Sequence, residues 1–197
     1  MQNRSISSFN LAWLFTGITL TGLALSIALT TDSRWSHWHL SRLGEGNSLS
    51  ASIFNFSLII AAMILSWLGI KVANEVRGDR PHAGVFILRS LLLFIALCWV
   101  GVATFPFDRF PIIHNLFGYG QFLTVGYAML GLKHLCPRFS DRTYFIGYGA
   151  ALITGLLMAI FHLTHFTSLL VVELIGQLFI YIWVLSMTAD QNGYLQK

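Results

Sequence analysis

The sequence predicts an all-α, polytopic membrane protein, with a single bundle of six transmembrane helices and short loops over residues 1–197. The first observation is composition: 55% of the residues are hydrophobic and only 10% are charged, whereas soluble domains carry about 25% charged residues. The second is that six continuous apolar runs are long enough to cross a bilayer. Only helices and closed barrels satisfy the backbone in lipid, and these runs do not alternate, so we expect helices.

The first run covers residues 9–31 and follows a short segment that carries Arg4. A secretory signal peptide begins in a similar way, but its apolar core is usually about 7–15 residues long. This run is longer, and we therefore predict an uncleaved first span.

Five further runs cover residues 51–73, 85–105, 116–133, 144–164 and 168–189. Each can cross a hydrocarbon core about 30 Å thick at about 1.5 Å per residue. The connections are short, so helices adjacent in sequence should be antiparallel neighbours.

The fifth run carries a stripe of small residues: Gly147, Ala151 and Gly155 recur at intervals of four. Such residues line one face of a helix and let a neighbouring helix approach closely. We read this stripe as packing, with no chemistry implied.

The distribution of Lys and Arg predicts the orientation of the bundle, because cytoplasmic loops carry an excess of these residues. Both termini are then cytoplasmic, and residues 32–50, 106–115 and 165–168 form external loops, in what we take to be the bacterial cytoplasmic membrane. The net charge of +4 is modest, and no basic stretch is long enough to bind nucleic acid. Nine basic residues fall on one side (Arg4, Lys71, Arg77, Arg80, Arg89, Lys133, Arg138, Arg142 and Lys197) and three on the other (Arg34, Arg42 and Arg109).

Several predicted spans carry a polar residue one to two turns below their outer ends. Polar groups at membrane depth are costly unless they face the bundle interior, a partner or water. We therefore infer an outward-facing polar cavity with the external loops as its rim. The polar layer contains Asn55, Thr104, Gln121, His162 and Glu173.

Glu173 is the only acidic residue well inside a predicted span, and two interpretations stay open. Either it pairs with His162, Asn55 or Arg42 and stabilises the bundle, or it binds a ligand or handles protons, since intramembrane carboxylates are functional candidates. We expect ligand contacts from the rim and from the polar layer together, at His114, Asp108, Asn115, Asn55, Gln121, Glu173, Ser41 and Arg42.

The segment "FPFDRFPIIHN", residues 105–115, separates the third and fourth runs. Pro106 and Pro111 explain why a helix stops here, since proline lacks a backbone donor and fixes its φ angle. Asp108 and Arg109 should pair with each other or with the first external loop. Asn115 is the expected N-cap of the next helix.

Histidines on the predicted outer side suggest a divalent metal site, zinc above all. His162 and His165 lie three residues apart, and His114 with Asp108 or Glu173 would complete the three or four ligands that zinc needs. There is no HExxH motif in support. Haem is disfavoured, because His162 has no histidine partner deep within another span.

Sequence support for nucleophilic catalysis is weak. There is no GxSxG motif, and neither Cys98 nor Cys136 lies near the outer histidines. The two cysteines should also lie at different depths, so no disulfide is expected. Ser41, Ser48 and Ser50 lie in the first external loop, where a Ser–His arrangement is conceivable, but serines are too common in loops to predict one.

Two segments resemble a known group of membrane proteins. The segment "HLSRLGEGNSLSASIFNFSLIIAAMILSWLGIKV" is similar to DRAM-type proteins, which have an external Ser-x-x-Gly turn followed by an Ile-Phe-x-x-x-Leu helix with basic residues at its inner end. "FPFDRFPIIHN" resembles a motif of bacterial and archaeal six-span proteins, family nine-nine-eight of the domains of unknown function. Together these groups form the DRAM/Frag/Sfk-like superfamily. The matching positions are Ser41, Gly44, Ser50, Phe54 and Asn55, then Phe105, Pro106, Asp108, His114 and Asn115.

The resemblance implies a six-span bundle, but no settled activity for the bacterial branch. Eukaryotic relatives are linked to autophagy, to remodelling of lipid anchors and to lipid asymmetry. This chain departs from the pattern at Arg42, where DRAM-type proteins usually carry an acidic residue.

Three functions are consistent with these features. The first is binding or handling of a membrane lipid or small amphiphile in the outward-facing cavity. The second is a metal-dependent membrane lipid hydrolase or transferase that uses the outer histidines with Asp108 or Glu173. The third is a non-catalytic assembly protein whose partner is a second copy or another membrane protein.

Overall fold

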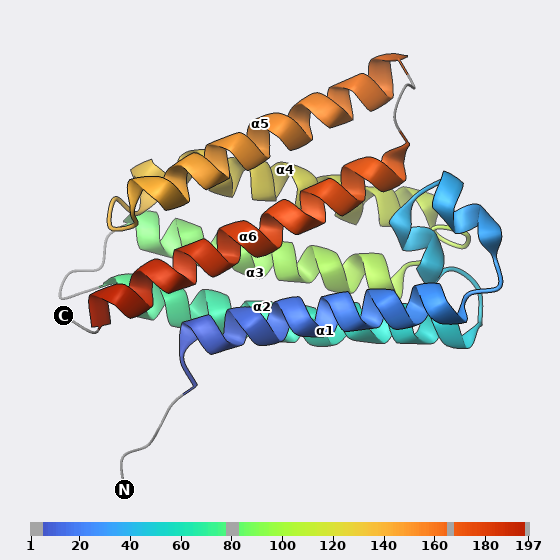
Figure 1. Ribbon diagram of the computed structural model, residues 1–197, viewed down its shortest axis with the longest axis horizontal. Helices are drawn as coiled ribbons and strands as arrows, with labels where there is room; N and C mark the ends of the chain where they lie inside the picture. Colours follow the sequence, from blue (N-terminus) through green and yellow to red (C-terminus); the bar gives the residue numbers. More distant parts are fainter. Residues whose placement is uncertain (1–5, 78–82, 165–167, 196–197) are drawn as a thin grey trace, which may run out of the picture.

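The computed structural model describes residues 6–77, 83–164 and 168–195, and over these ranges the chain is helical (Figure 1). Arg4, Arg80 and Lys197, on which the predicted orientation partly depends, and His165, a predicted metal ligand, lie outside these residues. Two short 3-10 helices, η1 and η2, precede the second of the six α-helices. The elements are α1 (Ser8–Leu29), η1 (Ser33–His37), η2 (Leu40–Gly44), α2 (Leu49–Arg77), α3 (Ala83–Thr104), α4 (Pro111–Leu135), α5 (Asp141–Thr164) and α6 (Leu169–Leu195).

Five of the helices are long and apolar enough to cross a membrane: α1, α2, α3, α5 and α6. Large apolar side chains cover the outside of the bundle, for example Phe86, Leu123 and Phe145, which are 70%, 70% and 72% exposed. Such an exterior is typical of a protein surrounded by lipid. The all-helical prediction is confirmed, and an integral membrane protein is the class that these helices indicate.

The fourth predicted span forms a helix but is more polar than the others. Asn115, Tyr119 and Gln121 fall in its first half, and α4 is not among the helices apolar enough to qualify as a span. It also begins earlier than expected, at Pro111, with Phe110 at the N-cap position. Two predictions were therefore wrong: Asn115 is not an N-cap, and Pro111 starts a helix, as suits its fixed φ angle.

The six helices form a closed ring in chain order, because each contacts the next and α1 also contacts α6. α1 begins and α6 ends at the same end of the bundle, on the left of Figure 1. We call residues 30–48, between α1 and α2, loop 1, and the end of the bundle that they cover the loop-1 end.

Most of the hydrophobic core lies in the half of the bundle away from loop 1. It includes an aromatic group in which the ring of Phe15 lies 5.2 Å from that of Trp99 and 5.7 Å from that of Tyr181, and Trp99 also lines the cavity described below. Burial of such large side chains supplies most of the packing energy. The largest fully buried side chains are Trp99, Trp183, Phe15, Leu11, Leu65, Leu68, Leu88, Leu92, Ile95, Leu132, Met187 and Val72.

A carboxylate joins α5 to α6 at the end opposite loop 1. Asp190 of α6 accepts hydrogen bonds from the backbone amide of Ser140 (2.8 Å), the Ser140 hydroxyl (2.8 Å) and the Thr143 hydroxyl (2.7 Å). Ser140 directly precedes α5, so Asp190 anchors the start of that helix. Hydrogen bonds to a charged group are each worth about 1.5–3 kcal/mol, which makes this carboxylate a principal link between the two helices.

The small-residue stripe of α5 is packed at one end only. A Cβ atom on Gly147 would lie 3.1 Å from Nε1 of Trp183 and 3.2 Å from the carbonyl oxygen of Met129, whereas one on Gly155 would meet nothing within 4 Å. The last buried residue of α5 is Thr154. α5 is therefore held against its neighbours in its first half and diverges from them toward the loop-1 end (Figure 1).

We expect the variant Gly147→Leu to be destabilised by about 1–3 kcal/mol, because an overpacked side chain must displace Trp183 or a backbone carbonyl. The matched variant Gly155→Leu should lose no stability. Thermal unfolding of both variants in detergent measures the difference. Equal melting temperatures would contradict the packing described for α5.

Candidate functional site

A cavity of about 380 Å³ lies among α2–α6, beneath loop 1. Its volume falls in the range of about 300–1,000 Å³ that is usual for small-ligand sites. The residues that line it come from loop 1, the turn between α3 and α4, and five helices: Trp38, His39, Leu40, Ser41, Phe54, Leu58, Trp99, Val102, Phe107, His114, Asn115, Gly118, Tyr119, Gln121, Phe122, Val125, Gly126, Met129, Ala151, Thr154, Met158, Phe161, Leu169, Val172, Glu173, Gly176, Gln177 and Ile180.

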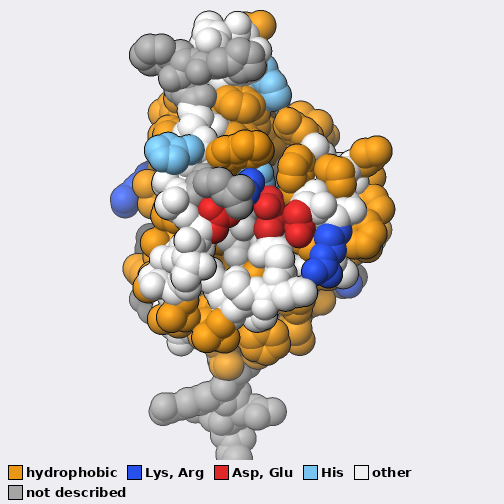
Figure 2. Space-filling view, turned by 90° about the vertical axis from the view of Figure 1, so that its right-hand side faces the viewer, with side chains coloured by type: hydrophobic (Ala, Val, Ile, Leu, Met, Phe, Trp, Pro, Cys, Tyr) orange, Lys and Arg blue, Asp and Glu red, His pale blue; other side chains and the backbone are white. Residues whose placement is uncertain are grey.

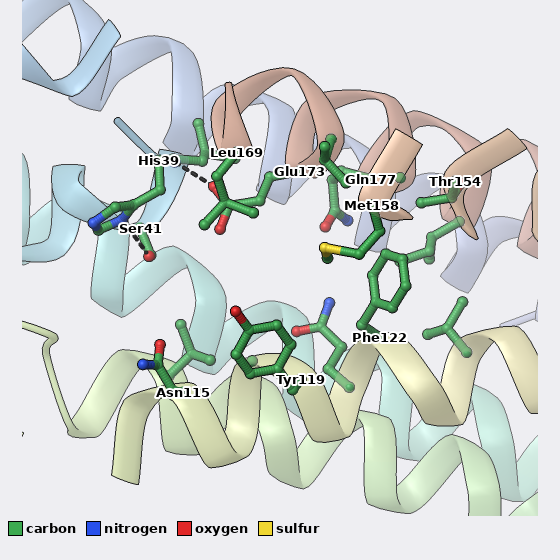
Figure 3. A pocket seen from close by; sticks show the side chains of 18 of the residues that line it. His39, Ser41, Asn115, Tyr119, Phe122, Thr154, Met158, Leu169, Glu173 and Gln177 are labelled. Atoms are coloured by element: carbon green, nitrogen blue, oxygen red, sulfur yellow. Dashed lines mark hydrogen bonds between the residues drawn. The ribbon is translucent and has the colours of Figure 1, made fainter. Parts of the chain in front are cut away.

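The cavity has a polar mouth and a mainly apolar interior, to which Gln121, Gln177 and Thr154 add three polar side chains. Figure 3 shows His39, Ser41 and Glu173 near loop 1, with Asn115 and Tyr119 on the opposite wall and Phe122 and Met158 farther in. The deepest wall is made of apolar side chains such as Val125, Met129 and Ile180. On α4 the lining begins at His114, and between Asn115 and Met129 it extends for about 21 Å at about 1.5 Å per residue.

Glu173 holds loop 1 over the mouth. Its carboxylate accepts a hydrogen bond from the backbone amide of Leu40 and interacts with that of Ser41. These amides open the 3-10 helix η2, whose N-cap residue, His39, makes no side-chain cap bond. Glu173 thus caps a helix from a distant part of the chain. The expectation that it pairs with His162, Asn55 or Arg42 was wrong.

Ser41 lies between two imidazoles. Its Oγ is 2.9 Å from Nδ1 of His39 and 3.0 Å from Nε2 of His114. The other ring nitrogen of His114, Nδ1, lies 2.8 Å from the carbonyl oxygen of Phe105. His39 and His114 are only 8% and 6% exposed, and the ring of Phe107 packs edge-on against each of them. The serine and both rings are therefore held in place at the cavity mouth.

Polar groups of α2 fix the far end of η2. Nδ2 of Asn55 donates to the carbonyl oxygen of Gly44 at 2.9 Å. Gly44 has no room for a side chain, since a Cβ there would lie 2.4 Å from Oδ1 of Asn55. Asn55 is thus bonded to loop 1 and does not line the cavity.

Charged residues tie loop 1 to itself and to the 106–110 turn. Nε of Arg42 lies 3.2 Å from a carboxylate oxygen of Asp32. Asp108 accepts from the backbone amide of Gly46 at 3.3 Å, where the positive φ of 74° suits glycine, and Arg109 donates to Asn47 at 2.8 Å. Of the two alternatives for Asp108 and Arg109, the structure favours pairing with loop 1. Figure 2 shows acidic and basic side chains near the middle of the loop-1 end, with hydrophobic side chains around them.

Five of the eight residues predicted to contact a ligand line the cavity, and three lie outside it. Ser41, His114, Asn115, Gln121 and Glu173 line its wall, whereas Asp108, Arg42 and Asn55 hold loop 1 in place. Five other polar or aromatic residues that line the cavity were not among the predicted ligand contacts. These are Trp38, His39, Phe107 and Tyr119 near the mouth and Gln177 farther in.

Three of those residues had signals in the sequence. His39 ends the "SHWH" stretch and has an extended backbone, with φ −151° and ψ 155°, so it turns inward. Tyr119 and Gln177 follow Asn115 and Glu173 by four residues each, and such spacing puts side chains on one helix face.

The predicted metal ligands are not gathered into one site in the described part of the chain. His114 and Glu173 both line the cavity, while His162 lies beside the rings of Tyr119 and Phe161. Among residues 6–77, 83–164 and 168–195 no group of three or more His, Cys, Asp and Glu could hold a metal ion. His165 lies outside these ranges, so the zinc site stays a prediction.

The environment of His39 makes the protein sensitive to acid. Burial, with the nearby His114 and Arg42, lowers the pKa of His39 to about 4. Glu45, whose Oε1 lies 3.7 Å from Nε2, does not offset these effects. The unfolded chain, with an ordinary histidine pKa of about 6.5, binds more protons between these two values.

We therefore expect stability to be constant above pH 6.5 and to fall as the pH drops toward 4, with a loss of about 2 kcal/mol at pH 5. Melting temperatures from pH 8 to pH 4.5 measure this loss. The variant His39→Asn keeps a polar partner for Ser41 and should show a flatter profile. An identical profile in both proteins would assign the acid sensitivity to other groups.

Comparisons of the chain with protein-family models, curated proteins and solved structures gave no match. The resemblance of residues 39–73 and 85–120 to the DRAM/Frag/Sfk-like superfamily stays a prediction. What the cavity can bind then follows from its walls, which are polar at the mouth and apolar beyond.

Proposed function

We propose that this protein is a six-span membrane protein that binds a lipid or another small amphiphile in the cavity beneath loop 1. The observation that carries the proposal is the division of one cavity into a polar mouth and a long apolar interior. An amphiphile has the same division, with its headgroup at the mouth and its chain inside. The membrane supplies such molecules at high concentration.

The dimensions of the cavity support a single acyl chain. The lining of α4 extends for about 21 Å, and one leaflet of the hydrocarbon core is about 15 Å thick, half of about 30 Å. A chain from one leaflet therefore fits along the cavity. The polar atoms at the mouth, from Ser41, Asn115 and Glu173, can bond a headgroup or its linkage.

The cavity also reaches the side of the bundle. Tyr119 lines it and is 41% exposed, although it lies two turns inside α4. Met158 and Phe161 line it from the half of α5 that diverges from its neighbours. A lipid can therefore enter from the membrane between α4 and α5 without passing through water.

The proposal includes an orientation, with the loop-1 end outside. Loop 1 and the 106–110 turn carry three basic residues, Arg34, Arg42 and Arg109, while connections at the other end carry more, as the positive-inside rule requires. α4 spans with the rest, and its polar residues face the cavity. The bound lipid then belongs to the outer leaflet.

Filling the cavity tests this function. Gly126 lines the interior, and a Cβ there would meet nothing within 4 Å, so the backbone leaves room for a side chain to start here and Gly126→Phe is chosen to place a ring in the cavity. We expect co-purified lipid, measured by native mass spectrometry after mild extraction, to fall at least about tenfold, which corresponds to about 1.4 kcal/mol.

The control is Gly155→Phe, on the exposed face of α5, where a Cβ also meets nothing within 4 Å. It should retain lipid as the wild-type protein does. Equal lipid content in the two variants, or none in the wild-type protein, would overturn the proposal.

A further inference from the structure

The protonation of the network around Ser41 follows from one contact. A carbonyl oxygen only accepts hydrogen bonds, so Nδ1 of His114, 2.8 Å from that of Phe105, carries the proton. Nε2 of the neutral ring is then an acceptor, and the Ser41 hydroxyl, 3.0 Å away, donates to it. His39 Nδ1, at 2.9 Å, supplies a second bond to the same oxygen.

A hydroxyl that donates to an imidazole with its other nitrogen held by an acceptor is the arrangement of an activated nucleophile. Here a backbone carbonyl takes the place of the usual carboxylate. It still fixes the tautomer and the orientation of the ring. Phe105, which supplies the carbonyl, and His114, which supplies the imidazole, both belong to the segment "FPFDRFPIIHN".

The location of Ser41 and His114 in the cavity indicates which class of substrate they could act on. Ser41, His39 and His114 line the cavity at its polar mouth, where the headgroup of a bound amphiphile joins its chain. That linkage in most acyl lipids is an ester. The opposite wall carries Asn115 and Tyr119 with their polar ends toward the cavity (Figure 3), and such N–H and O–H donors can stabilise an oxyanion.

We propose that Ser41 and His114 form a nucleophile–base pair that cleaves the ester of a long-chain acyl lipid held in the cavity. This inference rests on the proposed function, since the apolar interior must bind the acyl chain. Ser41 is the nucleophile, His114 the general base and acid, and Asn115 the donor to the oxyanion. His39 positions the serine oxygen.

The reaction has two balanced halves. Ser41 Oγ forms a bond to the carbonyl carbon while its proton passes to Nε2 of His114, and the ester C–O bond breaks as His114 returns that proton to the departing alcohol. Water then attacks the acyl-serine, with His114 again taking and returning a proton. The products are an alcohol and a fatty acid, with Ser41 regenerated.

The competing explanation is that Ser41 merely joins loop 1 to α4. A fluorophosphonate probe separates the two, because it forms a covalent adduct only with an activated serine. We expect mass spectrometry to locate the adduct on Ser41. The adduct should be absent in Ser41→Ala and in His114→Ala, and present in Ser36→Ala, a matched change of an exposed loop-1 serine.

Turnover is measured in nanodiscs of phosphatidylethanolamine and with p-nitrophenyl palmitate in detergent. Release of fatty acid should fall about 10³-fold or more in Ser41→Ala and remain unchanged in Ser36→Ala. Release from nanodiscs identifies membrane phospholipid as the source of the ester. Release of fatty acid from the nitrophenyl ester but not from nanodiscs supports the nucleophile–base pair and indicates that its natural substrate is an ester other than phosphatidylethanolamine.

Two results overturn the inference, and they are distinct from failure of the proposed function. Lipid retained in the wild-type protein without an adduct on Ser41 or any ester cleavage leaves binding intact and removes catalysis. Cleavage that survives in Ser41→Ala and stops with a chelator assigns the chemistry to a metal instead. If Ser41→Ala retains lipid but loses cleavage, both proposals stand together.

Discussion

Replacing Glu173 by alanine is expected to release loop 1 from the bundle and to cost about 2 kcal/mol. The carboxylate accepts from the Leu40 backbone amide, and a buried amide left without an acceptor costs about 1–3 kcal/mol. Arg42 in loop 1 is a trypsin site. Its cleavage in the folded protein should accelerate about 30-fold, the equivalent of about 2 kcal/mol.

The control for this change is Glu173→Gln, which keeps an oxygen able to accept from Leu40. Trypsin should cleave this variant after Arg42 at a rate between those for the wild-type protein and for Glu173→Ala. Equal cleavage rates in all three proteins would show that Glu173 does not hold loop 1. The carboxylate would then be free for the other interpretation of an intramembrane acid, contact with a ligand.

Replacing Asp190 by alanine should be the most destabilising of the polar substitutions, at about 3 kcal/mol. The change leaves the Ser140 amide and the hydroxyls of Ser140 and Thr143 without their shared acceptor, and each lost bond to a charged group costs about 1.5–3 kcal/mol, with overlap between them. Since α5 is packed only in its first half, it depends on this anchor. Thermal unfolding in detergent measures the loss.

Asp190→Asn retains one acceptor oxygen and loses the charge, so a smaller loss is expected. Ser186, whose hydroxyl lies 2.6 Å from that of Thr143, offers a further control: Ser186→Ala removes one neutral bond worth about 1 kcal/mol. The idea of an anchor fails if Asp190→Ala unfolds at the same temperature as Ser186→Ala.

The helices could be predicted from the sequence because their signal is local. Continuous apolar runs specify a lipid-facing helix whatever its neighbours are, and each predicted run contains the greater part of an observed helix. α4 differs from the other helices in composition, because its glycines and polar residues lower its hydropathy. Several of those residues line the cavity, namely His114, Asn115, Gly118, Tyr119, Gln121 and Gly126, so the weak hydropathy of this run already pointed to the site.

The cavity mouth could be predicted only in part because its bonds join distant segments. Glu173 and Leu40 are 133 residues apart, and His114 and Ser41 are 73 apart. Polar depth singled out Glu173 and Gln121, but it also singled out His162 and Thr104, which do not line the cavity. The depth of a residue along a predicted helix can be read from the sequence. The direction in which its side chain faces around the helix axis depends on how the neighbouring helices pack, which the sequence alone does not give.

The same long separation has a consequence for biosynthesis. Chains are made from the N-terminus, and parts fold as they emerge, so the Ser41–His114 contact can form once α4 is complete. The cap on η2 must wait for α6, which is made after α1–α5. Until then Ser41 and His114, the proposed nucleophile and base, lie beneath a loop that Glu173 does not yet hold. Completion of α6 is therefore the event that closes the site, and a ribosome stalled before it would leave an intermediate with an open site.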